Sequence, residues 1–238
     1  MNQNGLVKFA DRIFWNAYAS AYDDIARYYK PYKVLADKVA AVVRGNIEKG
    51  RILDAGCGTG ELSVKLGGLG YKVEAIDLSD AMLKRLKKKI KNKKNINIRI
   101  DKADLNRKLK YKENSFKSVI NIHSLFMLNN IYFTIDEFDR VLEPGGVLII
   151  AHHKPIKLLK VAAGIMKDEK FFTALISMLR LLRAGLFNVF LGSLHKNIYG
   201  NIDAKMIIDY ICLKNYSLAY HKQLYNNFDE LMVFVKGS

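Results

Sequence analysis

A glycine-rich turn over residues 56–60 constrains this chain more than any other feature, because it joins a buried-strand pattern to a helical one. Ile52, Leu53 and Ala55 are typical of the end of a short strand, and apolar residues recur at helical spacing from Leu62 onward. Glycines at every second position of the turn let the backbone bend tightly and approach a ligand closely. We therefore expect a strand, a turn and a helix in this order, with a binding site at the turn.

The charges around this turn indicate what it binds. Backbone amides of the turn and of the helix N-terminus carry partial positive charge, and Asp54 directly before the turn adds a negative charge. Such a site suits a zwitterionic cofactor better than a bare phosphate. The dinucleotide pattern G-x-G-x-x-G does not fit, because Glu61 stands where the third glycine is required.

Five segments resemble, in the same order, the motifs of class I S-adenosylmethionine-dependent methyltransferases. They are residues 53–60, 73–82, 102–105, 118–121 and 140–149. The N-terminal segment Trp15-Asn-Ala-Tyr18-Ala-Ser-Ala-Tyr22-Asp23 is similar to the lid of the group that includes ubiquinone, menaquinone and phospholipid N-methyltransferases. The resemblance implies S-adenosylmethionine as the cofactor and S-adenosylhomocysteine as its product.

The resemblance also implies which residues bind the cofactor. Asp77 ends the second strand, where its carboxylate can accept both ribose hydroxyl hydrogens. Asp104 corresponds to the acidic contact to adenine, although an aspartate of a surface turn is the alternative. The backbone carbonyls of Asn121 and Ile122 correspond to those that receive the methionine ammonium. The full cofactor-binding set is Tyr22, Asp54, Gly56, Cys57, Gly58, Gly60, Asp77, Leu78, Met82, Asp104, Leu105, Asn121 and Ile122.

Fewer sequence features indicate where the methyl acceptor binds. The candidate acceptor-binding residues are Trp15, Tyr18, Phe126 and Met127. The resemblance places Trp15 or Tyr18 at the acceptor entrance, whereas Phe126 and Met127 stand where relatives commonly have a pair of histidines. Three histidines at strand ends are the candidates for a catalytic proton acceptor, namely His123, His152 and His153. A packing role is the alternative for His123. We expect no metal site, because no carboxylate or cysteine accompanies the histidine pair at ligand spacing.

The fold class follows from the alternation of apolar runs and helical segments, which is typical of a doubly wound α/β fold. We expect a mainly parallel, seven-stranded, Rossmann-like sheet with strands near 51–55, 72–76, 97–100, 117–122, 146–151, 217–224 and 230–236. The chain is expected to be a single domain. Its parts are N-terminal lid helices over 1–45, a cofactor-binding core over 50–153, a helical insertion over 154–200 and a C-terminal helix with strands over 201–238.

The net charge of +16 is concentrated in two lysine clusters, over residues 84–94 and 107–112. A solvated surface, an anionic membrane and nucleic acid are all compatible with these clusters. The insertion adds eight Lys or Arg against Asp168 and Glu169, interleaved with large apolar residues. This pattern predicts either a helical pair folded onto its own domain or helices that lie in the interface of an anionic membrane.

The sequence thus predicts a methyltransferase acting on an apolar or lipid-like acceptor. A soluble metabolite as acceptor and a protein that binds or modifies nucleic acid are the alternatives, and the Asn-Pro-Pro-Tyr type motif for a flipped base is absent after the fourth strand. The first residues lack a signal-peptide pattern, and the two cysteines have no metal spacing. We expect a cytoplasmic protein, either free or peripheral at the membrane, and the sequence indicates no oligomeric state.

Overall fold

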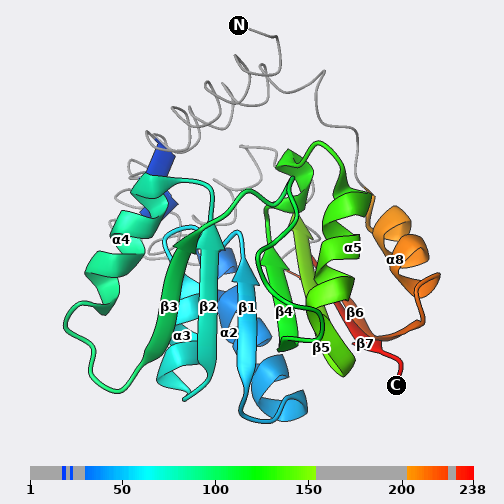
Figure 1. Cartoon of the computed structure of the whole chain (residues 1–238), viewed down its shortest axis with the longest axis horizontal. Coiled ribbons are helices and arrows are strands. Elements are labelled where there is room, and N and C mark those ends of the chain that lie inside the picture. The colour runs from blue at the N-terminus through cyan, green and yellow to red at the C-terminus, as the bar shows by residue number, and fades with distance from the viewer. Residues whose placement is uncertain (1–17, 20–21, 24–29, 154–202, 225–228) are drawn as a thin grey trace, which may run out of the picture.

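A computed structural model describes residues 18–19, 22–23, 30–153, 203–224 and 229–238 (Figure 1). Its centre is one seven-stranded sheet in the order β3-β2-β1-β4-β5-β7-β6. The strands are β1 (Arg51–Ala55), β2 (Lys72–Asp77), β3 (Asn97–Lys102), β4 (Phe116–Ile122), β5 (Leu142–His153), β6 (Tyr216–Leu224) and β7 (Asp229–Lys236). The helices are α2 (Lys30–Asn46), α3 (Glu61–Gly68), α4 (Asp80–Ile90), the short 3-10 helix η1 (Leu125–Met127), α5 (Ile131–Val141) and α8 (Ala204–Cys212).

The first five strands are parallel, and β7 is antiparallel to both β5 and β6. The order of strands reverses between β1 and β4, which are themselves hydrogen-bonded neighbours. In open α/β sheets of this kind, ligands bind outside the carboxyl ends of the strands at such a reversal. The predicted fold class is confirmed, and the functional site is to be sought where β1, β2 and β4 end.

Two apolar clusters, one on each face, hold the helices to the sheet (Figure 1). On one face Leu35, Leu66 and Leu86, from α2, α3 and α4, pack against β1 and its neighbours. On the other face Phe138 and Ile207, from α5 and α8, pack against β4, β5 and β7. Because the central strands are covered on both faces, Ile52 and Leu53 are both buried.

Two of the predicted regions lie outside the described residues, namely the helical insertion over 154–200 and most of the lid before residue 30. Among the residues that the structure describes, no helix is long and apolar enough to cross a membrane. The fifth strand begins earlier than its apolar run suggested, because Leu142 already pairs with Phe116 before a bulge shifts the register to Val147.

Candidate functional site

The backbone of the glycine turn is hydrogen-bonded to the end of β2. The amides of Gly56 and Cys57 both donate to the carbonyl of Ile76, at 2.8 and 2.9 Å. Gly56 and Gly58 have φ angles of +78° and +54°, in the left-handed region that favours glycine. A Cβ on Gly58 would lie 3.1 Å from the ring of Tyr22, so this ring lies directly beside the turn.

Two carboxylates flank the turn. Asp77 accepts hydrogen bonds from the amides of Gly58 at 2.9 Å and Ser79 at 2.8 Å, and burial nevertheless raises its pKa. Asp54 is buried and accepts a hydrogen bond from the Ser63 hydroxyl. Burial, opposed by that hydrogen bond and reinforced by Asp77, raises the pKa of Asp54 to about 6. The two acids give the site a negative potential suited to a ligand with cationic groups.

The end of β4 is joined to the end of β1 by one side chain. Asn121 is fully buried, and its amide group donates to the carbonyl of Ala55 at 2.8 Å and to the hydroxyl of Ser124 at 2.5 Å. Its Oδ1 atom is buried and has no hydrogen-bond partner among the described residues. A buried acceptor in this state is costly unless a donor reaches it. The Oδ1 atom of Asn121 can therefore accept a hydrogen bond from an N–H or ammonium group of a ligand beside the glycine turn.

Aromatic rings form a row from the lid to the end of β4. The ring centroids of Tyr18 and Tyr22 are 6.0 Å apart, those of Tyr22 and Tyr32 are 5.8 Å apart, and those of Tyr32 and His123 are 6.0 Å apart. The hydroxyls of Tyr22 and Tyr32 lie 3.4 Å apart. Burial raises the pKa of both phenols above the usual value, so they are neutral at physiological pH. The row therefore forms a mainly apolar wall, whose polar groups include the neutral hydroxyls of Tyr22 and Tyr32.

His123 occupies a strained position directly after β4. Its φ angle is +54°, which is uncommon for a residue with a side chain, and its amide donates to the carbonyl of Ala151 at 2.9 Å. Its Nε2 atom lies 3.0 Å from Oδ1 of Asp229 at the start of β7, and the two side chains are only 15% and 6% exposed. His152 is buried and follows Ile150 on the face that packs against α5 and α8. Of His153, the structure describes only the backbone.

The other predicted site residues differ in exposure. Leu78 is exposed, Met82, Leu105 and Ile122 are buried, and Phe126 and Met127 of η1 are half-buried. Burial raises the pKa of the Cys57 thiol well above its usual value, which disfavours the thiolate. Trp15 lies outside the described residues. Gly60 also has positive φ, and a Cβ there would meet the side chain of Leu86.

Asp104 has local partners in its own turn. Its Oδ1 atom accepts hydrogen bonds from both the backbone and the side-chain amide of Asn106, each at 3.0 Å. Its Oδ2 atom lies 3.5 Å from Nε of Arg107. These contacts are those of a turn aspartate, the alternative that the sequence left open, and a contact to adenine stays a prediction.

Four residues of this region carried no sequence signal of their own. They are Tyr32, Ser63, Ser124 and Asp229, which contact His123, Asp54, Asn121 and His123 respectively. Ser63 comes to the site through the path of α3, and Asp229 through the order of the strands.

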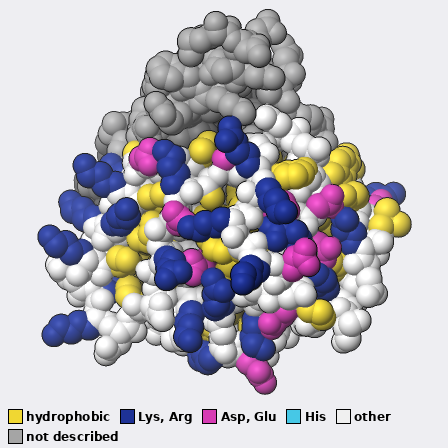
Figure 2. Space-filling model, viewed as in Figure 1, with side chains coloured by type: hydrophobic (Ala, Val, Ile, Leu, Met, Phe, Trp, Pro, Cys, Tyr) yellow, Lys and Arg dark blue, Asp and Glu magenta, His cyan; other side chains and the backbone are white. Residues whose placement is uncertain are grey.

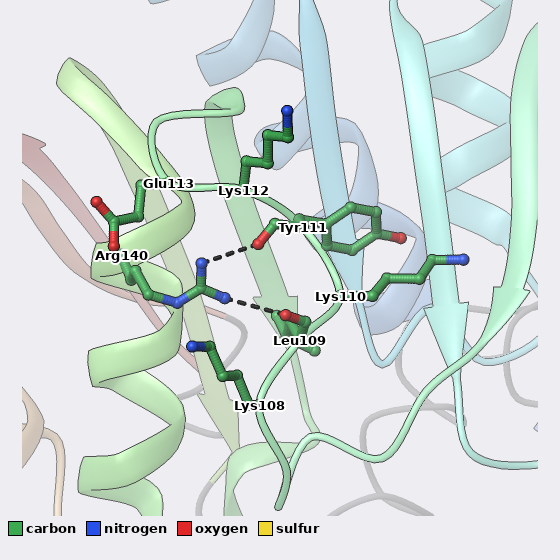
Figure 3. A pocket seen from close by; sticks show the side chains of 7 residues that line it. All are labelled: Lys108, Leu109, Lys110, Tyr111, Lys112, Glu113 and Arg140. Atoms are coloured by element: carbon green, nitrogen blue, oxygen red, sulfur yellow. Dashed lines mark hydrogen bonds between the residues drawn. The ribbon is translucent and has the colours of Figure 1, made fainter.

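A hollow between α5 and the loop before β4 is not this site (Figure 3). Arg140 there donates to the carbonyls of Leu109 and Tyr111, at 3.1 and 2.8 Å, and its guanidinium pairs with both carboxylate oxygens of Glu137. Glu137 in turn accepts from the amide of Leu109 at 2.7 Å. The polar groups of Arg140 and Glu137 are thus hydrogen-bonded to each other and to the loop. These contacts hold the loop before β4 to α5.

The lysine clusters are partly paired with acids. Figure 2 shows Lys and Arg side chains spread over one face of the molecule, with Asp and Glu between them. Lys102 pairs with Asp80, and Lys110 with Asp101. On α4, Arg85 and Lys89 both reach Asp23. Among the described residues, no group of His, Cys, Asp and Glu could hold a metal ion.

The comparisons with known proteins bear on this geometry. Residues 53–150 match the family described as "Methyltransferase domain". YqeM of Bacillus subtilis, named as a methyltransferase, is 31% identical over 153 residues, which cover 63% of this chain and 59% of that protein. The demethylmenaquinone methyltransferase of Tropheryma whipplei is 31% identical over 99 residues, which cover 42% of this chain and 40% of that protein. Residues 53–150 of this chain are therefore similar to a methyltransferase domain.

The fold of the domain agrees with solved structures. Magnesium protoporphyrin IX methyltransferase from Synechocystis, with bound S-adenosylhomocysteine, superposes with a TM-score of 0.66 over 97% of this chain and 100% of that chain, at 18% identity. The alignments span less than two thirds of the two curated relatives described above.

The cofactor of the methyltransferase domain is S-adenosylmethionine, and the residues present fit it. Gly58 leaves room that a Cβ would fill beside Tyr22, and the unpartnered Oδ1 of Asn121 offers an acceptor for a cationic amine. Asp54 is a buried acid whose raised pKa would fall beside a positive charge. Asp77 stands at the end of β2, the position that ribose hydroxyls require.

Proposed function

We propose that this protein transfers the methyl group of S-adenosylmethionine to an apolar, ring-bearing or lipid-like acceptor. The observation that carries the proposal is the row of aromatic rings from Tyr18 to His123, which borders the glycine turn. Such a wall favours an apolar acceptor, because it offers buried aromatic surface and few charged groups. When bound, the cofactor supplies an activated methyl group on a sulfonium.

The task of the chain's own residues is to hold the acceptor and exclude water. Tyr22 and Tyr32 are in place to cover the site between the glycine turn and β4. Positioning of this kind can supply several kcal/mol of the barrier reduction, roughly 7 to 11 in the best intramolecular cases. No covalent intermediate with the protein is needed. A proton released by the acceptor would go to one of the candidate histidines.

The likeness to demethylmenaquinone methyltransferase supports an apolar acceptor. It covers 42% of this chain, so the acceptor is argued mainly from the aromatic row. The histidine candidates for a proton acceptor remain His123, His152 and His153.

A labelled-methyl assay tests the proposal. Purified protein and methyl-labelled S-adenosylmethionine should label a short-chain naphthohydroquinone, extracted into organic solvent, faster than water-soluble amines or carboxylic acids. Tyr32→Leu should slow this transfer. Tyr210→Leu is the matched control, because Tyr210 packs on the opposite face of the sheet from Tyr32, where its ring centroid lies 4.5 Å from that of Tyr132. Efficient labelling of water-soluble acceptors alone would favour the alternative of a soluble metabolite.

Attachment to an anionic membrane remains part of the proposal and rests on the sequence of residues 154–200. Eight basic residues against two acidic ones accompany its large apolar side chains. Each basic residue near an anionic bilayer contributes about 1 kcal/mol. The protein should co-sediment with phosphatidylglycerol vesicles at low salt more than with phosphatidylcholine vesicles. Protein that stays in the supernatant with both would leave a cytoplasmic enzyme whose insertion covers its own site.

A further inference from the structure

We infer that the exposed lysines of α4 and of the turn after it bind the phosphate backbone of a nucleic acid. The inference goes beyond the proposed function, since none of these lysines is among the predicted cofactor-binding, acceptor-binding or catalytic residues. We call the six together the α4 lysine surface: Lys84, Lys87, Lys88, Lys91, Lys93 and Lys94.

Helix α4 turns its apolar side chains inward and these lysines outward. Met82, Leu83 and Leu86 are buried in the core, whereas all six lysines are exposed. Figure 2 shows Lys and Arg side chains along the edge of the molecule at which Figure 1 draws α4. The packing of the helix therefore brings six ammonium groups to one surface of the fold.

The other charged residues of this segment do not neutralise the surface. Arg85 and Lys89 both pair with Asp23, and Asp80, the one acid between residues 80 and 94, pairs with Lys102. Among the described residues, none of the six lysines has an ion-pair partner. Their positive charge is therefore available to a ligand.

Within the free protein these lysines repel one another. Lys84 and Lys88 are four residues apart on one helix, as are Lys87 and the C-cap residue Lys91, and like charges at this spacing are destabilising. The helix dipole favours basic residues in the last turn, which includes Lys87 and Lys88, but it does not account for Lys84 or for the lysines beyond the helix. A bound polyanion offsets this repulsion.

The absence of exposed apolar side chains favours nucleic acid over a membrane or an acidic protein. Between residues 80 and 94 no large apolar side chain is exposed, and Ile90 is partly buried against the core. A helix in the interface of a bilayer needs an apolar face that enters the lipid, and the centre of a protein interface is depleted of charged residues. A phosphate backbone is bound by positive charge, with release of counterions. We therefore expect binding that depends on salt and not on base sequence.

Two variants of equal net charge test the inference. The α4 variant replaces the six lysines of the α4 lysine surface with glutamine. The matched control replaces six exposed lysines elsewhere on the chain, which also have no ion-pair partner among the described residues: Lys33, Lys38, Lys72, Lys112, Lys205 and Lys222. Each variant lowers the formal net charge of +16 by six, so only the position of the charges differs.

Fluorescence anisotropy with labelled single-stranded RNA and duplex DNA of mixed sequence measures the affinity at about 0.1 M salt, where charges more than about 10 Å apart are largely screened. We expect the α4 variant to bind at least about tenfold more weakly than the wild type, and the control less than about threefold. The slope of log K against log[salt] should become shallower by roughly 2 to 4 in the α4 variant. Equal losses in both variants, or no binding of either nucleic acid by the wild type, would overturn the inference.

Vesicles distinguish a lipid surface from a nucleic acid as the partner. The α4 variant should co-sediment with phosphatidylglycerol vesicles to the same extent as the wild type. It should also retain its calorimetric affinity for S-adenosylhomocysteine, which shows that its fold is intact. Loss of vesicle binding by the α4 variant, while both variants bind nucleic acid equally, would assign the surface to a membrane and contradict the inference.

Crosslinking gives a readout that needs no variant. Ultraviolet irradiation of the wild type with thiouridine-labelled RNA should attach the RNA within residues 84–94, and mass spectrometry locates the attachment. Crosslinks confined to other segments of the chain would show that the RNA binds elsewhere, and the inference would be wrong even if the α4 variant did not fold.

Discussion

Oδ2 of Asp23 lies 2.7 Å from Nη1 of Arg85, and Oδ1 of the same carboxylate lies 2.9 Å from Nζ of Lys89. Lys89 also donates to the hydroxyl of Thr59 in the glycine turn at 3.0 Å. Asp23 directly follows Tyr22, whose ring lies beside Gly58. The ion pairs between Asp23 and α4 therefore hold the neighbouring Tyr22, which covers the glycine turn.

Asp23→Asn should loosen this cover and speed release of S-adenosylhomocysteine. The pKa of Asp23 is lowered, since the hydrogen bonds from Lys89, Thr59 and Arg85 outweigh the desolvation that would raise it. The ion pairs are partly exposed, so we expect a modest effect, about three- to tenfold in dissociation rate by stopped flow. Lys102→Ala, which breaks the exposed pair with Asp80 on the same helix, is the control and should have no effect.

Gly58→Ala should weaken cofactor binding more than it destabilises the fold. The new Cβ would lie 3.1 Å from the Tyr22 ring, in the space beside the turn. Gly70→Ala separates the two effects, because Gly70 also has positive φ, at +86°, but nothing within 4 Å of its Cβ. Both variants should lose about 1 kcal/mol of stability from backbone strain. Calorimetry that shows equal loss of S-adenosylhomocysteine affinity in both would contradict the placement of the site.

Asp54→Asn should stabilise the free protein at neutral pH. Burial raises the pKa of Asp54 from 3.8 to about 6, so the folded state binds this proton more tightly than the unfolded state. The stabilisation by the proton is fully present below pH 3.8 and is lost as the pH rises through about 6. Asparagine is uncharged like the protonated acid, so the variant does not lose this stability as the pH rises. Thermal unfolding should show a gain of roughly 1 to 3 kcal/mol at pH 7.5 that disappears near pH 4.

The same substitution should weaken the binding of S-adenosylmethionine at pH 7.5, because the negative charge is gone. In the wild type, affinity should rise with pH through about 6 as Asp54 ionises. A variant that is more stable and binds as tightly as the wild type would show that the Asp54 carboxylate does not face the cofactor.

Arg140→Met should destabilise the protein without changing cofactor affinity. The guanidinium makes charge-assisted hydrogen bonds to Glu137 and to the carbonyls of Leu109 and Tyr111. Their loss leaves the two carbonyls without this donor and the Glu137 carboxylate with the Leu109 amide as its remaining hydrogen bond, which costs about 2 to 4 kcal/mol. Urea unfolding measures this change. A folded variant with much weaker S-adenosylhomocysteine binding would show that these contacts also shape the cofactor site.

The strands and the glycine turn were predictable from the sequence, because both depend on local patterns. Apolar runs marked β1 and β4 within a residue of their observed ends, and the glycine spacing marked the turn. Parallel strands with covered faces leave such runs since both faces are buried. The cofactor class followed from the order of the motifs, and the methyltransferase domain match confirms it.

The partners of the site residues were not predictable, because they depend on the order of strands in space. Asp229 reaches His123 only since β7 lies between β5 and β6. Likewise, Ser63 reaches Asp54 only once α3 packs on the sheet. The hydrophobic periodicity of a sequence does not indicate contacts between different segments of the chain. The acceptor-side prediction for Trp15 falls outside the described residues.

The most direct test of the account is calorimetric binding of S-adenosylhomocysteine to the wild type, Asp77→Ala and Asp101→Ala. Asp77 lies at the end of β2 within hydrogen-bonding distance of the Gly58 amide, whereas Asp101 on β3 pairs with Lys110 at the surface. We predict tight binding by the wild type and Asp101→Ala, and a loss of roughly 1.5 to 3 kcal/mol, about ten- to a hundredfold in Kd, in Asp77→Ala. Binding of NAD in place of S-adenosylmethionine and its product, or equal affinity of the Asp77 variant, would contradict the assignment.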